Sequence, residues 1–270
     1  YFFFFVTVVL FNSCEIEPNT ESNKEDTSTD IFGNKVTIEN PNKAYLLDSS
    51  EVYIKEFIEQ HTKKTLYVSD EEVYTFEIHK AHLNKDTVED AIITLNRLSF
   101  AQKKAEESGK PWKGEAIGYM GPFNAFFYFD GLSNKISNPT VVPSSPLVPL
   151  KVTFENISSI DYKDILIDYR IRNSSFKEVY FLMNKLPELV FEFTNFDGLG
   201  TPNEEAYTYS FKPGQGQFTK NIIITESKVK TIPKGEDLFT YEPTLLKTNR
   251  FVKEFFYIKS KGKYFTTKDN

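Results

Sequence analysis

The chain has 270 residues, of which 40% are hydrophobic and 26% charged, and this allows one large domain or two halves that bury a common core. The net charge is −6 and the basic residues are mostly lysine, which disfavours nucleic acid because a phosphate-binding surface needs a Lys/Arg face. The single cysteine excludes a disulfide or a cysteine-based zinc site within these residues. The 26 Phe and 15 Tyr favour β-sheet.

Residues 1–13 read YFFFFVTVVLFNS and carry no charge. This run is too short to cross a bilayer of about 30 Å as a helix, but it has the length of the apolar part of a signal peptide. The basic segment and the initiator Met of such a peptide are missing, so we expect the printed chain to begin inside it. Cys14 follows directly.

Residues 10–14, Leu-Phe-Asn-Ser-Cys, resemble the relaxed lipobox of a type II signal, as in Bacteroidota lipoproteins. Ser13 fits the pattern, whereas Phe11 and Asn12 depart from it. The resemblance implies that residues 1–13 are removed and that lipid is attached to Cys14, which would hold the chain at the outer membrane of a cell envelope. The alternative is a buried structural cysteine on an N-terminal strand.

Residues 14–30 are polar and acidic, and such a segment buries too little apolar area to offset its ordering entropy. We therefore predict a flexible tether, with ordered structure from about Ile31. Acidic residues soon after the cysteine also resemble a surface-export signal of Bacteroidota lipoproteins, which implies exposure at the cell surface. A plain linker explains them equally well, so the periplasmic and the extracellular face both stay open.

Two helices are predicted. Asp48 can cap residues 49–61, and Ile54, Phe57, Ile58 and His61 fall on one face at helical spacing, with His61 as a helix-end residue rather than a ligand. The second helix covers residues 98–108 and is stopped by Gly109 and Pro111.

The remaining pattern predicts strands, which are short, aromatic or β-branched, and separated by Asn, Gly, Pro and Asp. In VYTFEIH, residues 73–79, the alternation places His79 on a face that we expect to meet solvent. The predicted strands are residues 64–69, 73–79, 90–97, 124–131, 149–156, 164–172, 178–183, 189–193, 206–211, 220–227 and 254–260.

Residues 139–149, PTVVPSSPLVP, are proline-rich, and proline blocks ladder hydrogen bonds, so we predict an extended connection here. It separates a first α+β half, residues 31–138, from a second β-rich half, residues 150–270, which shares a core with the first. The fold class is therefore β-dominated α+β, with antiparallel or mixed sheets and one or two short helices. An internal echo pairs DAIITL at 90–95 with DILIDY at 164–169, and FDGL at 129–132 with FDGL at 196–199. Two related β halves, or coincident turn signals, would each explain it.

The most specific local pattern is HLNKDTVED, residues 82–90, which leads directly into a predicted strand. It resembles the DxNxDGxxD calcium loop of FG-GAP/VCBS-type repeats and dockerin-like modules. The resemblance implies calcium ligands at Asn84, Asp86, the Val88 carbonyl and Asp90, since calcium takes several oxygen ligands. His82 replaces the first Asp and Thr87 replaces the turn Gly, so the alternative is a loop of this shape that holds no ion.

No GxSxG elbow, HExxH, Walker A or GxGxxG pattern occurs, and Ser144-Ser145 and Ser174-Ser175 are typical of turns. The tyrosines within residues 199–218 can pack in a sheet or stack on a sugar or a partner. We therefore expect a binding or accessory module of the envelope, facing the surface or the periplasm, with a protein or glycan partner and no assigned catalytic residue. The alternative is an envelope hydrolase acting on polysaccharide or peptide; an acidic cleft with His79 or Arg170 would favour it.

Overall fold

The computed structural model describes residues 27–29, 35–37, 51–215 and 218–266, with side chains from residue 55 onwards. The predicted signal peptide, Cys14, most of the tether and Asp48 lie outside the described residues. A first compact unit, residues 1–43, contains a hairpin of β1 (Thr27–Thr29) and β2 (Lys35–Thr37). Thr27–Thr29, at the end of the predicted tether, form one strand of this hairpin.

The second unit, residues 44–270, contains two antiparallel sheets. In the five-stranded sheet the order is β3-β4-β5-β6, and β7 pairs with the other part of β5. Its strands are β3 (Thr75–Ala81), β4 (Asp90–Asn96), β5 (Gly121–Asp130), β6 (Lys135–Ile136) and β7 (Thr140–Ser144). The central strand β4 is buried along its whole length, as its continuous apolar run predicts.

The eight-stranded sheet follows the chain in reverse order, from β15 to β8, so each neighbour is joined by a hairpin connection. Its strands are β8 (Lys151–Glu155), β9 (Asp164–Ile171), β10 (Ser174–Met183), β11 (Leu186–Asp197), β12 (Glu205–Lys212), β13 (Asn221–Val229), β14 (Leu245–Ile258) and β15 (Lys263–Phe265).

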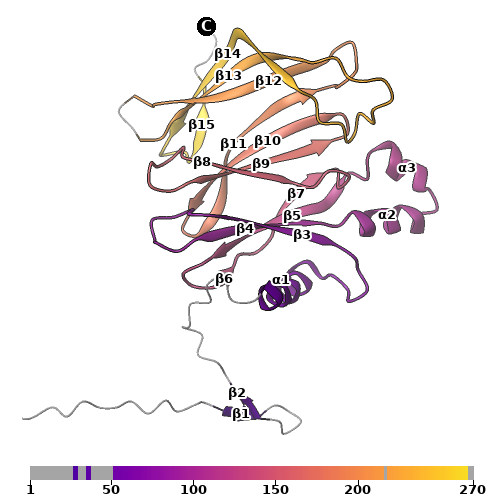
Figure 1. Cartoon of the computed structure of the whole chain (residues 1–270), viewed down its shortest axis with the longest axis vertical. Helices are drawn as coiled ribbons and strands as arrows, with labels where there is room; N and C mark the ends of the chain where they lie inside the picture. The colour runs from indigo at the N-terminus through magenta and orange to yellow at the C-terminus, as the bar shows by residue number, and fades with distance from the viewer. Residues whose placement is uncertain (1–26, 30–34, 38–50, 216–217, 267–270) are drawn as a thin grey trace, which may run out of the picture. The chain divides into compact units, whose positions relative to one another are not determined.

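The two sheets face each other across one buried cluster (Figure 1). Ile92 and Phe126 enter it from the five-stranded sheet, and Ile167 and Tyr180 from the eight-stranded sheet. The rings of Phe126 and Tyr180 meet edge to face, with 5.1 Å between their centroids. The two predicted halves of the body thus contribute to the same core, and the β-dominated α+β class is confirmed.

Helix α1 (Glu51–Leu66) covers the opposite face of the five-stranded sheet, where Ile58 packs with Ile93 and Phe127 (Figure 1). The helix extends five residues beyond the predicted end, so the strand predicted for residues 64–69 is wrong. The turn comes at Tyr67, which adopts a positive φ of 52°. Local β propensity yields here to the apolar helical face packed on the sheet.

Helix α2 (Leu98–Glu107) confirms the second predicted helix, and α3 (Pro111–Ala116) was not predicted. The sequence pattern predicts Pro111 as a stop signal for the preceding helix. Proline is also favoured at the first helical position, because its N–H would have no partner there, and Pro111 occupies that position in α3.

The proline-rich segment 139–149 was predicted as a connection without ladder bonds, and this is wrong for its first part. Residues Thr140–Ser144 form β7, with Thr140 opposite Phe126 and Val142 opposite Asn124. A shift in register between Gly121 and Asn124 accommodates the strand, and β7 lies at the edge of its sheet, where proline is tolerated.

One part of the internal echo has a structural counterpart. Ala81 pairs with Asp90 and Glu155 pairs with Asp164, so the loops 82–89 and 156–163 each contain eight residues and end at an aspartate that starts the next strand. The FDGL echo has none. Gly131 follows β5, which is antiparallel to β4, so it lies near the start of β4. Gly198 follows β11, which runs in the same direction as β9, so it lies near the end of β9 and the two turns are not equivalent.

Candidate functional site

The eight-stranded sheet opens between β11 and β12. These strands pair only at Phe196 with Ala206 and at Asp197 with Glu205, although both strands continue well beyond those pairs. The separation leaves a cleft of about 510 Å³. Its floor comes from β9, β10 and β11 and its wall from β12, with further groups from β8 and from the segment that precedes β14.

A polar cluster occupies the floor of the cleft. Asp168 and Lys177 are cross-strand partners in β9 and β10, and the Lys177 ammonium lies 2.6 Å from the Asp168 Oδ2. Asn195 donates through Nδ2 to the Asp168 Oδ1 at 2.8 Å and to the Ser175 hydroxyl at 3.1 Å. The Lys177 side chain is 5% exposed and that of Asp168 19%. A charge removed from water in this way needs compensation, which Asp168 supplies to Lys177.

Aromatic side chains form the wall. Tyr207, Tyr209 and Phe211 alternate along β12 and line the cleft. The Tyr209 ring meets Phe193 edge to face at 5.2 Å, and its centroid lies 5.1 Å from the Lys177 ammonium, close enough for a cation–π interaction. The aromatic wall and the charged floor therefore touch each other, and burial raises the pKa of the Tyr209 hydroxyl to about 12.

The charges that line the cleft are mostly negative. Glu155, Asp168 and Glu242 face one ammonium, that of Lys177. Carboxylates accept hydrogen bonds, an ammonium donates them, and aromatic rings offer flat apolar contact. This combination suits a ligand rich in hydroxyl groups and without negative charge.

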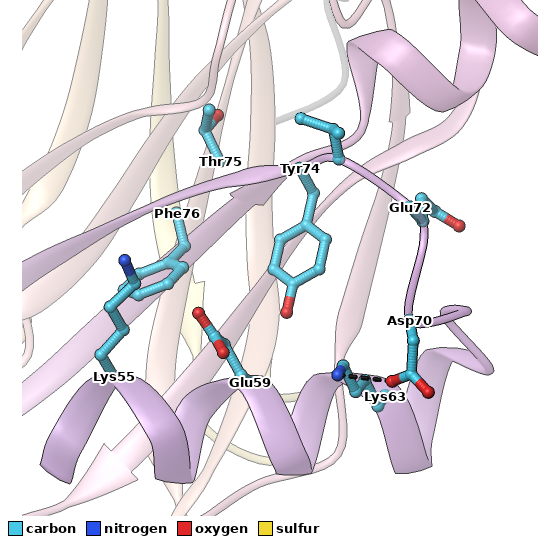
Figure 2. A pocket seen from close by; sticks show the side chains of 9 residues that line it. Lys55, Glu59, Lys63, Asp70, Glu72, Tyr74, Thr75 and Phe76 are labelled. Carbon is cyan, nitrogen blue, oxygen red and sulfur yellow. Dashed lines mark hydrogen bonds and ion pairs between the residues drawn. The ribbon is translucent and has the colours of Figure 1, made fainter. Parts of the chain in front are cut away.

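A second groove, of about 530 Å³, lies between α1 and the start of β3 (Figure 2). Lys55, Glu59 and Lys63 project from the helix towards Tyr74 and Asp70 on the other side. The Lys63 ammonium contacts the Asp70 carboxylate at 2.6 Å, and this pair lowers the pKa of Asp70. Exposed pairs of this kind contribute little to stability. The groove is open and charged. Glu72 at its edge is buried, with 5% of its side chain exposed, and accepts from the Arg97 guanidinium at 2.5 and 2.8 Å.

The predicted calcium residues lie in the loop between β3 and β4, and protein donors occupy their side-chain oxygens. The Asn84 Oδ1 accepts from the Asp86 backbone N–H at 2.7 Å, and the Asp86 Oδ1 accepts from that of Val88 at 2.9 Å. Nearby, Lys185 pairs with the buried Asp130, which raises the pKa of Lys185. Among the described residues, no three His, Cys, Asp or Glu side chains are grouped to hold a metal ion.

Asp90, the last predicted calcium ligand, is fully buried and accepts four hydrogen bonds. Its Oδ2 accepts from the Leu83 backbone at 3.3 Å and from Asn84 at 2.9 Å. Its Oδ1 accepts from the Tyr128 hydroxyl at 3.0 Å and from the Gly131 backbone at 3.1 Å. Burial raises the pKa of Asp90 to about 6 in spite of these donors.

His79 and Arg170, the residues that would have favoured an enzyme, do not line the cleft. His79 was expected to meet solvent, but its side chain is only 24% exposed and burial lowers its pKa. Arg170 is buried on β9 and donates to the Leu238 carbonyl at 2.8 Å and the Tyr241 carbonyl at 3.1 Å, while its guanidinium covers the Phe196 ring. It fixes the segment between β13 and β14.

The serine pairs also have structural roles. Ser144 and Ser145 are completely buried, and their hydroxyls donate to the carbonyls of Val142 and Gly118. The Ser174 hydroxyl contacts Asp197, and Gly198 N–H donates to it, so this serine organises the turn after β11.

The sequence pattern predicts the tyrosines of the wall but not the polar groups of the floor. Tyr207 and Tyr209 lie in β12, where the sequence allowed sugar stacking beside ordinary sheet packing. Asp168 and Lys177 interrupt apolar runs, which is a signal that polar groups are kept inside a sheet. Their contact, however, depends on the register of β9 and β10, which the sequence does not specify.

Compared with known proteins, the chain matches no family model, no curated protein and no solved structure. None of the helices described here is both long and apolar enough to cross a membrane.

Proposed function

We propose that the protein is a lipid-anchored binding module of a bacterial cell envelope, and that the cleft between β11 and β12 binds an uncharged, hydroxyl-rich ligand such as a glycan. The contact of Asp168, Lys177 and Asn195 beneath the Tyr209 ring is the observation that supports the cleft as the binding site. The anchor is supported by the sequence around Cys14 alone.

The ligand class follows from the donors, acceptors and charge of the cleft. A sugar presents hydroxyls that both donate and accept, which matches a carboxylate beside an ammonium. Its C–H faces can pack on Tyr209 and Phe211. The excess of carboxylates disfavours acidic ligands. Asp168 and Lys177 on the floor are held in place by the pairing of β9 with β10, which reduces the ordering cost of binding.

The cleft is tested by screening the chain on a glycan array and titrating the best ligand by calorimetry. Tyr209→Ala should weaken binding by roughly thirtyfold, as loss of a central aromatic contact does. Asp168→Asn should weaken it as well, since the amide donates where the carboxylate accepts. Tyr67→Ala is the matched control, because Tyr67 is 90% exposed and does not line the cleft. Unchanged affinity in both cleft variants would exclude this site.

The same experiment separates binding from hydrolysis. Glu155, Asp168 and Glu242 line one cleft, and paired carboxylates can cleave a glycosidic bond. A binding module returns the ligand intact after prolonged incubation. Shortened products that disappear in Asp168→Asn would favour the hydrolase instead.

The anchor is tested by mass spectrometry of the protein made in a bacterial envelope. We expect a mature N-terminus at Cys14 that carries acyl chains, and Cys14→Ala should release the protein from the membrane fraction. An intact, unmodified bond between Ser13 and Cys14 would contradict the anchor without affecting the cleft.

A further inference from the structure

The hairpin of β14 and β15 exposes apolar side chains on its outer face. Phe256 pairs with Phe265, while Tyr257 pairs with Tyr264 and both tyrosines point inward to the core. The outer side chains of Phe256, Ile258 and Phe265 are 37%, 41% and 42% exposed. A sheet with one solvated face normally carries polar residues there, so an apolar cluster needs a partner.

Lysines flank these apolar side chains at the turn of the hairpin, whereas Arg250, further along β14, pairs with Glu226 at 2.8 Å. Residues 245–266 contain six Lys or Arg and one acidic residue, although the whole chain has a net charge of −6. Lys259, Lys261 and Lys263 are exposed at and beside the turn. The one acid, Glu254, already accepts from Asn221 at 2.8 Å, and Lys212 lies 3.6 Å from it. The face is therefore both apolar and positively charged.

Two simpler explanations each account for either the lysines or the apolar side chains, but not for both. Lysines protect an edge strand against pairing with another chain, and β15 ends the sheet order, but this does not explain Phe256 and Phe265. A second copy docked on the same face would cover the apolar groups, but it would also bring like-charged lysines together.

We propose that the outer face of the β14–β15 hairpin docks on an anionic lipid bilayer. Lysines attract anionic headgroups, and apolar side chains beside them enter the boundary between headgroups and acyl chains. The docked hairpin would fix the orientation of the folded body on the membrane. This contact goes beyond the proposed ligand cleft and does not depend on it.

The test places a spin label on Ser260→Cys, in the β14–β15 turn, in the full chain carrying Cys14→Ala. Accessibility of the label to a water-soluble nickel complex and to oxygen is measured on phosphatidylcholine vesicles with and without phosphatidylglycerol. The measurement is local, so it reports on the hairpin whatever else holds the chain on the vesicle. We expect loss of nickel access and gain of oxygen access on anionic vesicles, and no change for a label at Ser108→Cys, directly after α2.

Charge variants provide the quantitative test. The ratio of docked to free label should fall by about a hundredfold when Gln replaces Lys259, Lys261 and Lys263. The matched control replaces the exposed Lys103, Lys110 and Lys113, which changes net charge equally and should have no effect. High salt should release the hairpin of the parent chain. A label that stays in water on anionic vesicles, or that is equally protected without vesicles because the chain dimerises, would overturn the proposal.

Discussion

The loops 82–89 and 156–163 have the same length and end at equivalent aspartates, yet the two aspartates are satisfied in different ways. Asp90 accepts from its own loop and from the distant Tyr128 and Gly131. Among the residues that the structure describes, Asp164 accepts from its own loop alone: its Oδ2 from the backbone of Ile157 and Ser158, at 3.0 and 2.6 Å, and its Oδ1 from the Ser158 hydroxyl at 2.7 Å.

Two loops of the same length and with the same final aspartate therefore differ in how their carboxylates are bonded. The carboxylate of the second loop is satisfied by neighbours in sequence, so its bonds can form as soon as the hairpin forms. The distant contacts of this loop are backbone bonds, from Lys220 N–H to the Ile157 carbonyl and from Lys163 N–H to the His82 carbonyl, both at 2.9 Å. The first loop is completed only when the end of β5 reaches it, so it joins a local turn to the order of strands in the sheet. The consequences of substitution should therefore spread further from the first loop than from the second.

The largest difference is expected at Gly131. A Cβ atom there would lie 2.0 Å from the Glu89 carbonyl oxygen, so Gly131→Ala must push β5 away from the first loop. We expect a loss of about 3 kcal/mol in the free energy of unfolding, measured by urea denaturation. Gly109→Ala is the control; Gly109 has a positive φ but an open surrounding, and its substitution should cost about 1 kcal/mol. Equal effects would show that the first loop has no such constraint.

The next largest effect is the difference in stability loss between Asp90→Asn and Asp164→Asn. In Asp90→Asn the new amide N–H groups face the donors Leu83 or Gly131, whose backbone N–H groups cannot turn away, and we expect a loss of about 2 kcal/mol. In Asp164→Asn the amide can donate to the Ser158 hydroxyl, which rotates to accept, while its oxygen keeps both backbone bonds. A loss below about 1 kcal/mol is expected there. A larger fall in Tm for Asp164→Asn than for Asp90→Asn, measured in thermal melts, would contradict this difference between the loops.

A smaller effect is the pH dependence of the free energy of unfolding that Asp164 of the second loop contributes. Burial raises the pKa of Asp164 to about 6 in the folded chain, so between its unfolded pKa and that value the folded state binds more protons. Stability must therefore fall as pH rises through the folded pKa, by about 1 kcal/mol between about pH 5 and about pH 7. Denaturation at both pH values checks this, and Asp164→Asn should lose that part of the slope. An identical slope in the variant would show that Asp164 titrates normally.

The smallest effect is expected from calcium. The oxygens of Asp90 already hold four protein donors, and the Lys185 ammonium lies beside the same loop, so the loop gains little from an added cation. Millimolar calcium should raise the Tm by less than about 1 °C. Magnesium and Asp86→Asn serve as controls. A saturating rise in Tm that Asp86→Asn removes would instead assign calcium to the loop.

The sequence predicted most strands because alternation is a local signal. Tyr74 and Phe76 pack under α1 as their spacing indicates. His79 differs because its ring lies beside Thr94 of the paired strand β4, at 3.5 Å, and that pairing is not visible in the local spacing. The candidate site shows the same limit: the alternation of Tyr207 and Tyr209 is visible in the sequence, whereas the cleft exists because β11 and β12 separate after two pairs.

That short pairing has a mechanical consequence. Among the described residues, backbone ladder bonds join β12–β15 to the rest of the sheet only through the two pairs of β11 with β12. Elsewhere the connection consists of side-chain packing, such as Phe191 on Tyr264, of the Arg170 bonds to two carbonyls, and of the bond from the Lys220 N–H to the Ile157 carbonyl at 2.9 Å. Side-chain contacts yield at lower cost than a continuous ladder. We therefore expect β12–β15 to move slowly as one unit and so to set the width of the cleft between β11 and β12. The bonds of Arg170 should limit this movement.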